Sequence, residues 1–333
     1  MQPTAKPGAS ALTRRAAAMA MAGAFFVAGG RTAGAAGTAT LRIANFQNAN
    51  VLPLFYGIDK GYFAAAGLDV QIVKVPDGAA SVAAVASGQA DIGWSATAVP
   101  MFARANGVPV KIFMTAGQEG PPDHYGTFID ATGKSGITSF SQVKGKTVVI
   151  NAFGTATELA IRERLQRAGV GWDDVKTIVV PFPQMPAALQ LGDADVAVTI
   201  YPMQALIMAN KAIAAVMLDK GTLIESHAAP VTAACYFATE GWLAKNRAVA
   251  LAFGRAYLRA AKEVRASAQL RTDLLVKLIG MKPALAALIP DPTWFHELSV
   301  TKAAVQPNYE ALIHTGMLTK TFPIDSVIET LPY

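Results

Sequence analysis

Residues 75–93 read VPDGAASVAAVASGQADIG, and residues 180–197 read VPFPQMPAALQLGDADVA. Each stretch is an apolar strand ending in Val-Pro, a loop, a short Ala-rich helix, and Gly-x-Ala-Asp before another apolar strand. Glycine suits the C-terminal end of each helix because, without a Cβ, it adopts a positive φ at little cost. A chain that repeats this unit in each half is predicted to form two similar α/β lobes that face each other. Such an arrangement favours a binding cleft over a catalytic pocket.

Length and composition agree with two lobes. At 333 residues the chain is too long for one ordinary core and sufficient for two. A hydrophobic content of 52% with 16% charged residues excludes a disordered chain. The net charge of +6 comes mostly from residues 1–35, which hold four of the 29 basic and none of the 23 acidic residues, so 25 basic and 23 acidic residues remain. A polyanion partner such as nucleic acid therefore has little support.

Residues 1–35 are typical of an export signal peptide. Lys6 and Arg14-Arg15 form a charged region, residues 16–30 are an apolar run, and Ala33-Gly34-Ala35 offers a cleavage site after Ala35. The apolar run is too short to span a bilayer. Thr13-Arg14-Arg15 resembles a twin-arginine signal, but alanines stand where Phe and Leu usually follow, so Tat and Sec export both stay open.

The single cysteine, Cys235, bears on the destination of the chain. One cysteine allows no disulfide within the chain, and none lies beside the cleavage site to carry a lipid. We therefore expect a free monomer in a bacterial periplasm and not a lipoprotein. Within its apolar strand, Cys235 is expected to be a small buried core residue.

Strand and helix patterns alternate twice along the rest of the chain, which predicts an α/β fold with two parallel-cored lobes and a helical C-terminal buttress. We expect residues 36–128 to form the first part of lobe 1, 129–232 to form lobe 2, and 233–333 to return to lobe 1 and add the C-terminal helices. The chain would cross between lobes near 126–130 and 231–238.

Several local predictions can be checked against the structure. Residues 94–97 are expected in a loop, and residues 212–218 in a strand. Thr155 and Glu158 are predicted to form a capping box at the start of a helix. Helical segments are expected over 240–279, with interruptions near Asn246 and Leu270, and over 283–289.

Motifs for enzyme chemistry are mostly absent. Gly133-Lys134-Ser135 and Gly145-Lys146-Thr147 lack the glycine that a phosphate loop needs five residues earlier, where Phe128 and Phe140 stand. The four histidines form no HExxH pair and have no cysteine at ligand spacing. There is no G-x-S-x-G elbow either. We therefore expect no catalytic residue, no metal and no cofactor.

The ends of the predicted strands are the best candidates for a binding site. In open α/β sheets, ligands bind outside the carboxyl ends of the strands, where helix N-termini present unpaired N–H groups. Four loops and one nearby tyrosine meet this description. The predicted ligand-binding residues are Asn45, Phe46, Gln47, Asn48, Asp77, Gly78, Ser95, Ala96, Thr97, Asn151, Phe153, Gly154, Thr155 and Tyr201.

Each candidate also has a structural explanation. Asp77 and Thr155 can cap the helices that follow them, and the amides of residues 45–50 can form turns. Trp94 can pack in a core or contact a ligand. Asp91 and Asp195 occupy the same place in the two repeats, which favours a scaffold role for both.

Three motifs resemble a known family. Residues 54–70, LFYGIDKGYFAAAGLDV, resemble a signature of periplasmic substrate-binding proteins of ABC importers in the nitrate/sulfonate/taurine class, also called the thiamine-pyrimidine-synthase-like family. GQADI at 88–92 and VKGKTV at 143–148 resemble two further motifs of that family. The resemblance implies a two-lobed, type II periplasmic binding protein fold that closes on one small molecule by hinge motion. It also implies delivery of that molecule to a membrane permease and, indirectly, to its ATPase.

The candidate loops also bear on the ligand. A carboxylate at Asp77 and few Lys or Arg residues in these loops disfavour a sulfonate and leave room for a neutral or amine-bearing ring such as a pyrimidine. Aromatic residues that would suit a planar ligand are Phe46, Trp94, Phe153, Phe182 and Tyr201. Two alternatives stay open: the enzyme of the same fold that makes the thiamine pyrimidine, and a sensor subunit. The export leader and the lack of a cysteine-rich stretch argue against the enzyme.

Overall fold

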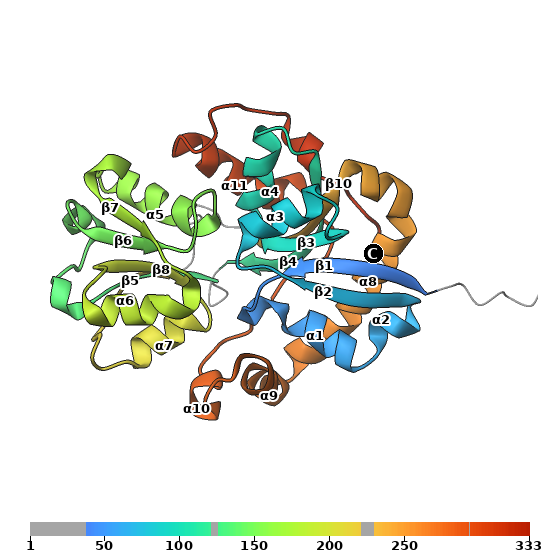
Figure 1. Cartoon of the computed structure of the whole chain (residues 1–333), viewed down its shortest axis with the longest axis horizontal. Helices are drawn as coiled ribbons and strands as arrows, with labels where there is room; N and C mark the ends of the chain where they lie inside the picture. The colour runs from blue at the N-terminus through green and yellow to red at the C-terminus, as the bar shows by residue number, and fades with distance from the viewer. Residues whose placement is uncertain (1–37, 121–125, 221–229, 293) are drawn as a thin grey trace, which may run out of the picture. The chain divides into compact units, whose positions relative to one another are not determined.

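The computed structural model describes residues 38–120, 126–220, 230–292 and 294–333. The predicted export signal lies outside the described residues, so its cleavage site and export route stay predictions. The described chain builds two five-stranded sheets with helices around each (Figure 1). We call the sheet of order β2-β1-β3-β10-β4 and its helices the first lobe, and the sheet of order β7-β6-β8-β5-β9 and its helices the second lobe.

The first lobe has a mixed sheet. β1 pairs in parallel with β2 and β3, and β10 lies antiparallel between β3 and β4. The strands are β1 (Ala39–Asn45), β2 (Leu68–Lys74), β3 (Ile92–Ala96), β4 (Val110–Glu119) and β10 (Val231–Thr239). The helices from the first half of the chain are η1 (Ala49–Val51), α1 (Leu52–Asp59), α2 (Tyr62–Ala65), α3 (Gly78–Ala86) and α4 (Ala98–Ala105).

The second lobe follows the same plan. β6 pairs in parallel with β7 and β8, and β5 lies antiparallel between β8 and β9. The strands are β5 (Thr127–Ala131), β6 (Thr147–Ile150), β7 (Lys176–Val179), β8 (Val196–Ile200) and β9 (Val216–Lys220). The helices are η2 (Gly133–Ser135), η3 (Phe140–Val143), α5 (Ala156–Arg167), η4 (Trp172–Asp174), η5 (Phe182–Gln184), α6 (Met185–Leu191) and α7 (Met203–Ala209).

The crossings between the lobes are made by β5 and β10. β5 pairs antiparallel with β8 in the second sheet, and β10 pairs antiparallel with β3 in the first sheet. The chain enters the second sheet at Thr127 and is back in the first sheet from Val231. The domain boundaries predicted inside these two strands, after 128 and after 232, stay predictions.

Both faces of the second sheet are covered by helices. Val196 and Val198 of β8 pack with Ile161 and Leu165 of α5, whereas the intervening Ala197 packs with Leu189 of α6 on the other face. A strand buried on both faces needs apolar side chains at every position. This explains why residues 196–198 of β8 form an uninterrupted apolar run.

Asp91 and Asp195, which occupy the same place in the two repeats, make the same contacts in both lobes. The Asp91 N–H donates to Arg42 O at 2.8 Å, and Asp91 Oδ2 accepts the Arg42 N–H at 2.8 Å. The Asp195 N–H donates to Thr147 O at 2.8 Å, and Asp195 Oδ2 accepts the Thr147 N–H at 2.8 Å. Each aspartate therefore ties the start of one core strand to its parallel neighbour, which is the predicted scaffold role.

The C-terminal helices complete the first lobe. Phe253 of α8 stacks on Phe63 of α2 with ring centroids 5.3 Å apart, and both rings belong to the buried cluster beneath β1. The elements are α8 (Glu240–Ala266), α9 (Ala268–Ile279), α10 (Pro283–Ala286), α11 (Lys302–His314) and η6 (Ile324–Val327).

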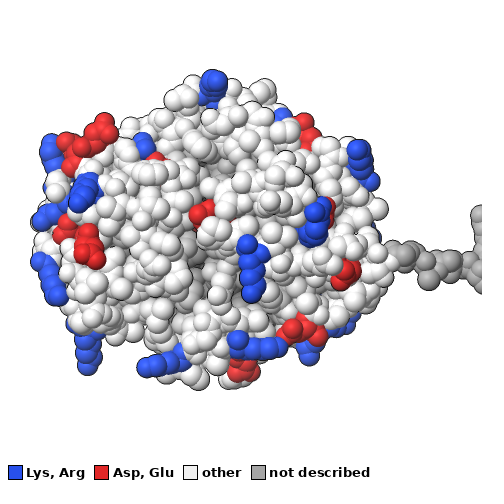
Figure 2. All heavy atoms as spheres, in the orientation of Figure 1, with Lys and Arg blue, Asp and Glu red and all other residues white. Residues whose placement is uncertain are grey.

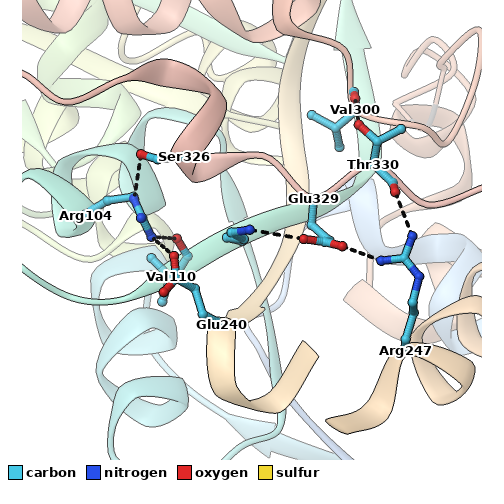
Figure 3. Close-up of polar contacts among 9 residues, drawn as sticks. Arg104, Val110, Glu240, Arg247, Val300, Ser326, Glu329 and Thr330 are labelled. Carbon is cyan, nitrogen blue, oxygen red and sulfur yellow. Dashed lines mark hydrogen bonds and ion pairs between the residues drawn. The ribbon is translucent and has the colours of Figure 1, made fainter. Parts of the chain in front are cut away.

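The C-terminal tail is fastened to β4 by a polar seam (Figure 3). The Glu329 N–H donates to Ile112 O at 2.8 Å, its carboxylate pairs with Lys111 at 3.2 Å, and Arg247 of α8 pairs with the same carboxylate. Arg104 of α4 contacts Glu240 at 2.7 Å and donates to Ser326 Oγ at 3.1 Å. These contacts join three parts of the first lobe that are far apart in the sequence.

Some local predictions were wrong. Residues 94–96 belong to β3 instead of a loop, because they pair with Ala234, Cys235 and Tyr236 of β10. The strand predicted over 212–218 runs from Val216 to Lys220, after Ala214 at a φ of 50°. The long helical segment does deviate at Asn246, as predicted, but its second break is at Ser267, which caps α9, and not at Leu270. The helix predicted over 283–289 ends at Ala286.

Candidate functional site

A cavity that is open in part to solvent lies between the two lobes. Both sheets contribute to it at the ends of their core strands, and so do the crossing strands β5 and β10. From the first lobe and its crossing strand, the lining residues are Phe46, Asn50, Gly78, Trp94, Ala96, Val99, Glu119, Ala233 and Ala234. From the second lobe and the segment entering it, they are Gly126, Thr127, Asn151, Thr155, Ala156, Thr157, Phe182 and Ile200.

An aromatic pair forms part of the first-lobe wall. Phe46, just after β1, meets Trp94 of β3 edge to face with ring centroids 5.0 Å apart. Trp94 is buried, and its indole N–H has no acceptor among the described residues. Phe182 adds a third ring from the second lobe. These rings offer flat apolar surface, with the indole N–H as an unused donor.

The polar part of the second-lobe wall comes from the loop between β6 and α5. Asn151 Oδ1 accepts from Thr157 Oγ1 at 2.6 Å and from Thr155 Oγ1 at 3.3 Å, and Thr155 Oγ1 also donates to Ala152 O at 2.7 Å. These bonds hold the first turn of α5 against the cavity. Helix N-termini carry unpaired N–H groups, so this wall can donate to a ligand.

The predicted capping box is wrong in this loop. Thr155 is the N-cap of α5, but its side chain makes no cap hydrogen bond. The reason is that its hydroxyl is used within the loop. Glu158 does reach back, although to Gly154 N–H at 2.6 Å and not to the N–H of Thr155.

Glu119, the last residue of β4, provides the acid of the site. Its carboxyl group is buried at the crossing between the lobes, where Oε1 accepts from Gly126 N–H at 2.7 Å and Thr127 N–H at 3.1 Å. Burial raises the pKa of Glu119 to about 8, against the opposing effect of these two N–H groups. No Lys or Arg is among the residues that line the cavity.

Five predicted binding residues line this cavity: Phe46, Gly78, Ala96, Asn151 and Thr155. Three others, Asn45, Gln47 and Asn48, line a second cavity that Phe46 also borders.

The remaining predicted residues lie elsewhere. Asp77 Oδ1 accepts from Ala80 N–H at 2.9 Å and so caps α3. Ser95 and Thr97 are fully buried in the first lobe. Phe153 is 56% exposed, Gly154 lies against the ring of Phe102, and the Tyr201 ring packs at 4.6 Å from that of Phe128. None of these six is among the residues that line the cavity between the lobes.

Glu119 was not among the candidate residues predicted from the sequence. The signal in the sequence was an acidic residue at the carboxyl end of a buried strand, the kind of position where the binding loops were expected. Asn50 lay inside a candidate loop but was not chosen. Ala233 and Ala234 carry no chemical signal, since small apolar residues in a strand are ordinary.

Metal-ligating clusters and the single thiol can be assessed in the described residues. They contain no group of three or more His, Cys, Asp or Glu side chains that could hold a metal ion. Cys235 is buried, and burial raises the pKa of its thiol to about 12, which disfavours the nucleophilic thiolate. In the described part of the chain, no helix has the length and apolar content needed to cross a membrane.

Comparisons with known proteins agree with the motifs. The NMT1/THI5-like family model matches residues 48–269, which is most of the chain. The chain belongs to this family. No match was found among curated protein sequences.

Solved structures show the same fold at low sequence identity. The alkanesulfonate-binding protein SsuA of Xanthomonas axonopodis pv. citri, bound to MOPS, is 16% identical with a TM-score of 0.75 over 89% of this chain and 99% of its own. The periplasmic nitrate-binding protein NrtA of Synechocystis PCC 6803 is 15% identical with a TM-score of 0.69, over 88% of this chain and 86% of its own.

The desulfurization enzyme DSZB is 14% identical with a TM-score of 0.62, covering 88% of this chain and 96% of its own. The fold is therefore shared by binding proteins and an enzyme. These matches confirm the predicted two-lobed, type II periplasmic binding protein fold, while identities this low say nothing about the ligand.

Proposed function

We propose that this protein is a periplasmic solute receptor that binds one small organic molecule between its lobes and passes it to an ABC transporter permease. The observation that supports this most directly is a cavity whose walls come from both sheets and from the crossing strands β5 and β10. A ligand there contacts both lobes at once. Its binding energy would therefore favour a closed state over an open one.

The charge distribution fits a receptor for a small molecule. Figure 2 shows that charged side chains of both signs are scattered over the visible face, without a large patch of one sign. Such a surface offers little to a polyanion. The expected partners are the small ligand and the permease, with the ATPase reached only through the permease, and the expected state is a monomer.

A ligand screen with two readouts tests this function. Sulfonates, nitrate, aromatic acids, pyrimidines and short amines would be screened by thermal shift, and each stabilising compound followed by mass spectrometry for chemical change. A true ligand at 100 times its Kd adds about 2.7 kcal/mol to the free energy of unfolding. The bound protein should also show a smaller radius of gyration by small-angle X-ray scattering. Stabilisation by no class, or conversion of a compound to product, contradicts the receptor function.

The enzyme alternative has one specific observation behind it, the shared fold with a desulfurization enzyme. The cavity itself holds no cysteine and no histidine among its described lining residues. The same mass-spectrometric measurement separates the two functions, because a receptor returns its ligand unchanged.

A further inference from the structure

The second cavity, which Asn45, Gln47 and Asn48 line, is built by the first lobe. Its other lining residues come from the loop after β1, from η1 and α1, from β2 and the residue after it, and from the end of α9. They are Phe46, Val51, Leu52, Phe55, Ile72, Lys74, Val75, Leu278 and Ile279. All of these described lining residues lie in the first lobe. The second cavity therefore differs from the cavity between the lobes, although Phe46 borders both.

Two polar side chains are neighbours at one edge of the second cavity. Asn45 ends β1 and Lys74 ends β2, and the two residues are partners in the parallel pairing of these strands. Side chains at paired positions of neighbouring strands lie on the same face of a sheet. The carboxyl ends of parallel strands are also where open α/β sheets bind ligands. An amide and an ammonium group are therefore placed together at an edge suited to a ligand.

Both of these groups are unused within the described chain. The Asn45 side chain is buried, and its Oδ1 has no hydrogen-bond donor among the described residues. A buried acceptor without a donor costs free energy, and a ligand that supplies an O–H or N–H group recovers it. The Lys74 side chain is exposed at the rim and forms no ion pair with a residue that the structure describes. Lys74 is also the one charged residue among the described residues that line this cavity.

The other amides of the second cavity are already engaged. Gln47 Nε2 donates to Leu278 O, which fastens the loop after β1 to the end of α9. Asn48 Nδ2 donates to Phe46 O at 2.9 Å, and Asn48 Oδ1 accepts from Asn50 N–H at 2.8 Å. Asn45 and Lys74 are thus the polar side chains left for a ligand.

The remaining surface of the second cavity is apolar. Leu52 and Phe55 of α1, Ile72 of β2 and the last two residues of α9 supply it. An apolar group that covers this surface gains free energy in proportion to the area removed from water. The cavity therefore suits a molecule with an apolar body and a small polar end.

We propose that the second cavity is a separate binding site for an α-hydroxy carboxylic acid with an apolar side chain. The carboxylate pairs with the Lys74 ammonium, the α-hydroxyl donates to Asn45 Oδ1, and the apolar group lies against Phe55 and Ile72. The anion and the donor belong on adjacent carbons because Asn45 and Lys74 are paired neighbours. An α-amino acid fits less well, since its ammonium would meet Lys74 and no acid among the described lining residues.

Four probes with the same phenyl ring test this ligand class by titration calorimetry: phenyllactate, phenylpropionate, phenyllactamide and phenylalanine. Phenyllactate should bind tightest. Phenylpropionate, which lacks the hydroxyl, should bind roughly tenfold weaker because the buried Asn45 oxygen stays without a donor. Phenyllactamide, which lacks the charge, should bind roughly fivefold weaker because an ion pair with an exposed lysine contributes modestly. Phenylalanine should also bind several-fold weaker than phenyllactate.

Two variants assign the two contacts. Lys74→Met removes the ammonium but keeps an unbranched chain, so it should weaken phenyllactate roughly fivefold and leave phenyllactamide nearly unchanged. Asn45→Leu removes the oxygen and should make phenyllactate and phenylpropionate bind alike. Lys176→Met, at an exposed lysine of the second-lobe strand β7, is the matched control and should leave all four affinities unchanged. In heteronuclear NMR spectra, phenyllactate should shift the amide signals of residues 45–48, 74–75 and 278–279 most.

The outcomes separate this inference from the receptor function. Equal binding of phenyllactate and phenylpropionate to the wild-type protein, or an unchanged phenyllactate affinity in Lys74→Met, overturns the second site. Binding of none of the four probes, or amide shifts centred on the cavity between the lobes, overturns it as well. The receptor function is tested independently by the ligand screen, whose compounds should bind Lys74→Met as they bind the wild-type protein. If Asn45→Leu does not fold by circular dichroism, the four probes on the wild-type protein and on Lys74→Met decide.

Discussion

The two lobes share a sheet plan, and they differ where the cavity is. Asp91 and Asp195 make the same pair of backbone contacts in both. The loop before α3 instead brings Gly78 to the cavity and uses Asp77 as a helix cap, whereas the corresponding loop before α6 brings Phe182. The matched positions build the scaffold, and Gly78 and Phe182, at unmatched positions, line the cavity. Four predictions test this division, from the largest expected effect to the smallest.

The two repeats differ in the space for a side chain at Gly93, whose counterpart in the second repeat is Ala197. A Cβ on Gly93 would lie 2.4 Å from the Phe237 ring and 2.6 Å from Ser81 Oγ. Gly93→Ala should therefore lower the free energy of unfolding by about 3 kcal/mol, the upper range for overpacking a core. Ala197→Gly, the reverse change in the second lobe, should cost only about 1 kcal/mol. Guanidinium unfolding measures both, and equal losses would show that the two strands are packed alike.

Each lobe has a buried acid with a raised pKa, but only one of the two lines the cavity. Burial raises the pKa of Asp130 in β5 to about 7, although the Thr199 and Gln204 side chains oppose the shift, and that of Glu119 to about 8. The folded state then holds protons that the unfolded state releases above its ordinary carboxyl pKa. Stability should therefore fall as pH rises from about 4 toward 7 or 8, by at most about 1.4 kcal/mol per pH unit for each group.

Asp130→Asn should remove its part of this slope without changing ligand affinity, and Glu119→Gln should remove the other part. Urea unfolding between pH 5 and pH 8 measures the slopes. A wild-type stability that rises over this range would contradict both assignments.

In the unmatched loops, Asp77→Ala should mainly lower stability, whereas Phe182→Ala should mainly weaken ligand binding. Asp77→Ala removes a helix cap and should cost about 1 kcal/mol of stability. Phe182→Ala removes a ring from the cavity wall and should weaken the ligand found in the screen by tenfold or more. The effect of Asp77→Ala on that affinity should be several-fold smaller. Titration calorimetry and thermal unfolding of both variants decide, and a larger affinity loss for Asp77→Ala would place its carboxylate in the site after all.

Substitution of either matched aspartate, Asp91 or Asp195, should lower the free energy of unfolding by a similar amount. Asp91 also pairs with the Arg42 side chain at 2.8 Å, whereas Asp195 forms no side-chain ion pair with any residue that the structure describes. Asparagine keeps an acceptor for the backbone N–H in each case. Asp91→Asn should therefore cost up to about 1 kcal/mol more than Asp195→Asn, because exposed ion pairs contribute little. A much larger difference would mean that the two copies are not equivalent scaffold positions.

Local patterns predicted most of the elements because their causes are local. The repeat, the alternation of strands with helices and the break at Asn246 follow from glycine, apolar runs and turn residues near in sequence. The loop predicted at 94–97 failed because pairing with β10, some 140 residues later, decides that strand. The capping box failed because Asn151 and Ala152 take the Thr155 hydroxyl, which only the folded loop brings into reach.

The sequence by itself determined the fold class and the family, since these depend on periodicity and on motifs read along the chain. Only the tertiary structure decided which side chains share the cavity. Asp77 caps its own helix, Ser95 and Thr97 lie buried in the first lobe, and Glu119 lines the cavity at the end of β4. The doubled unit sets up two similar lobes, but a binding site depends on contacts between lobes, and those are long-range contacts that no local pattern encodes.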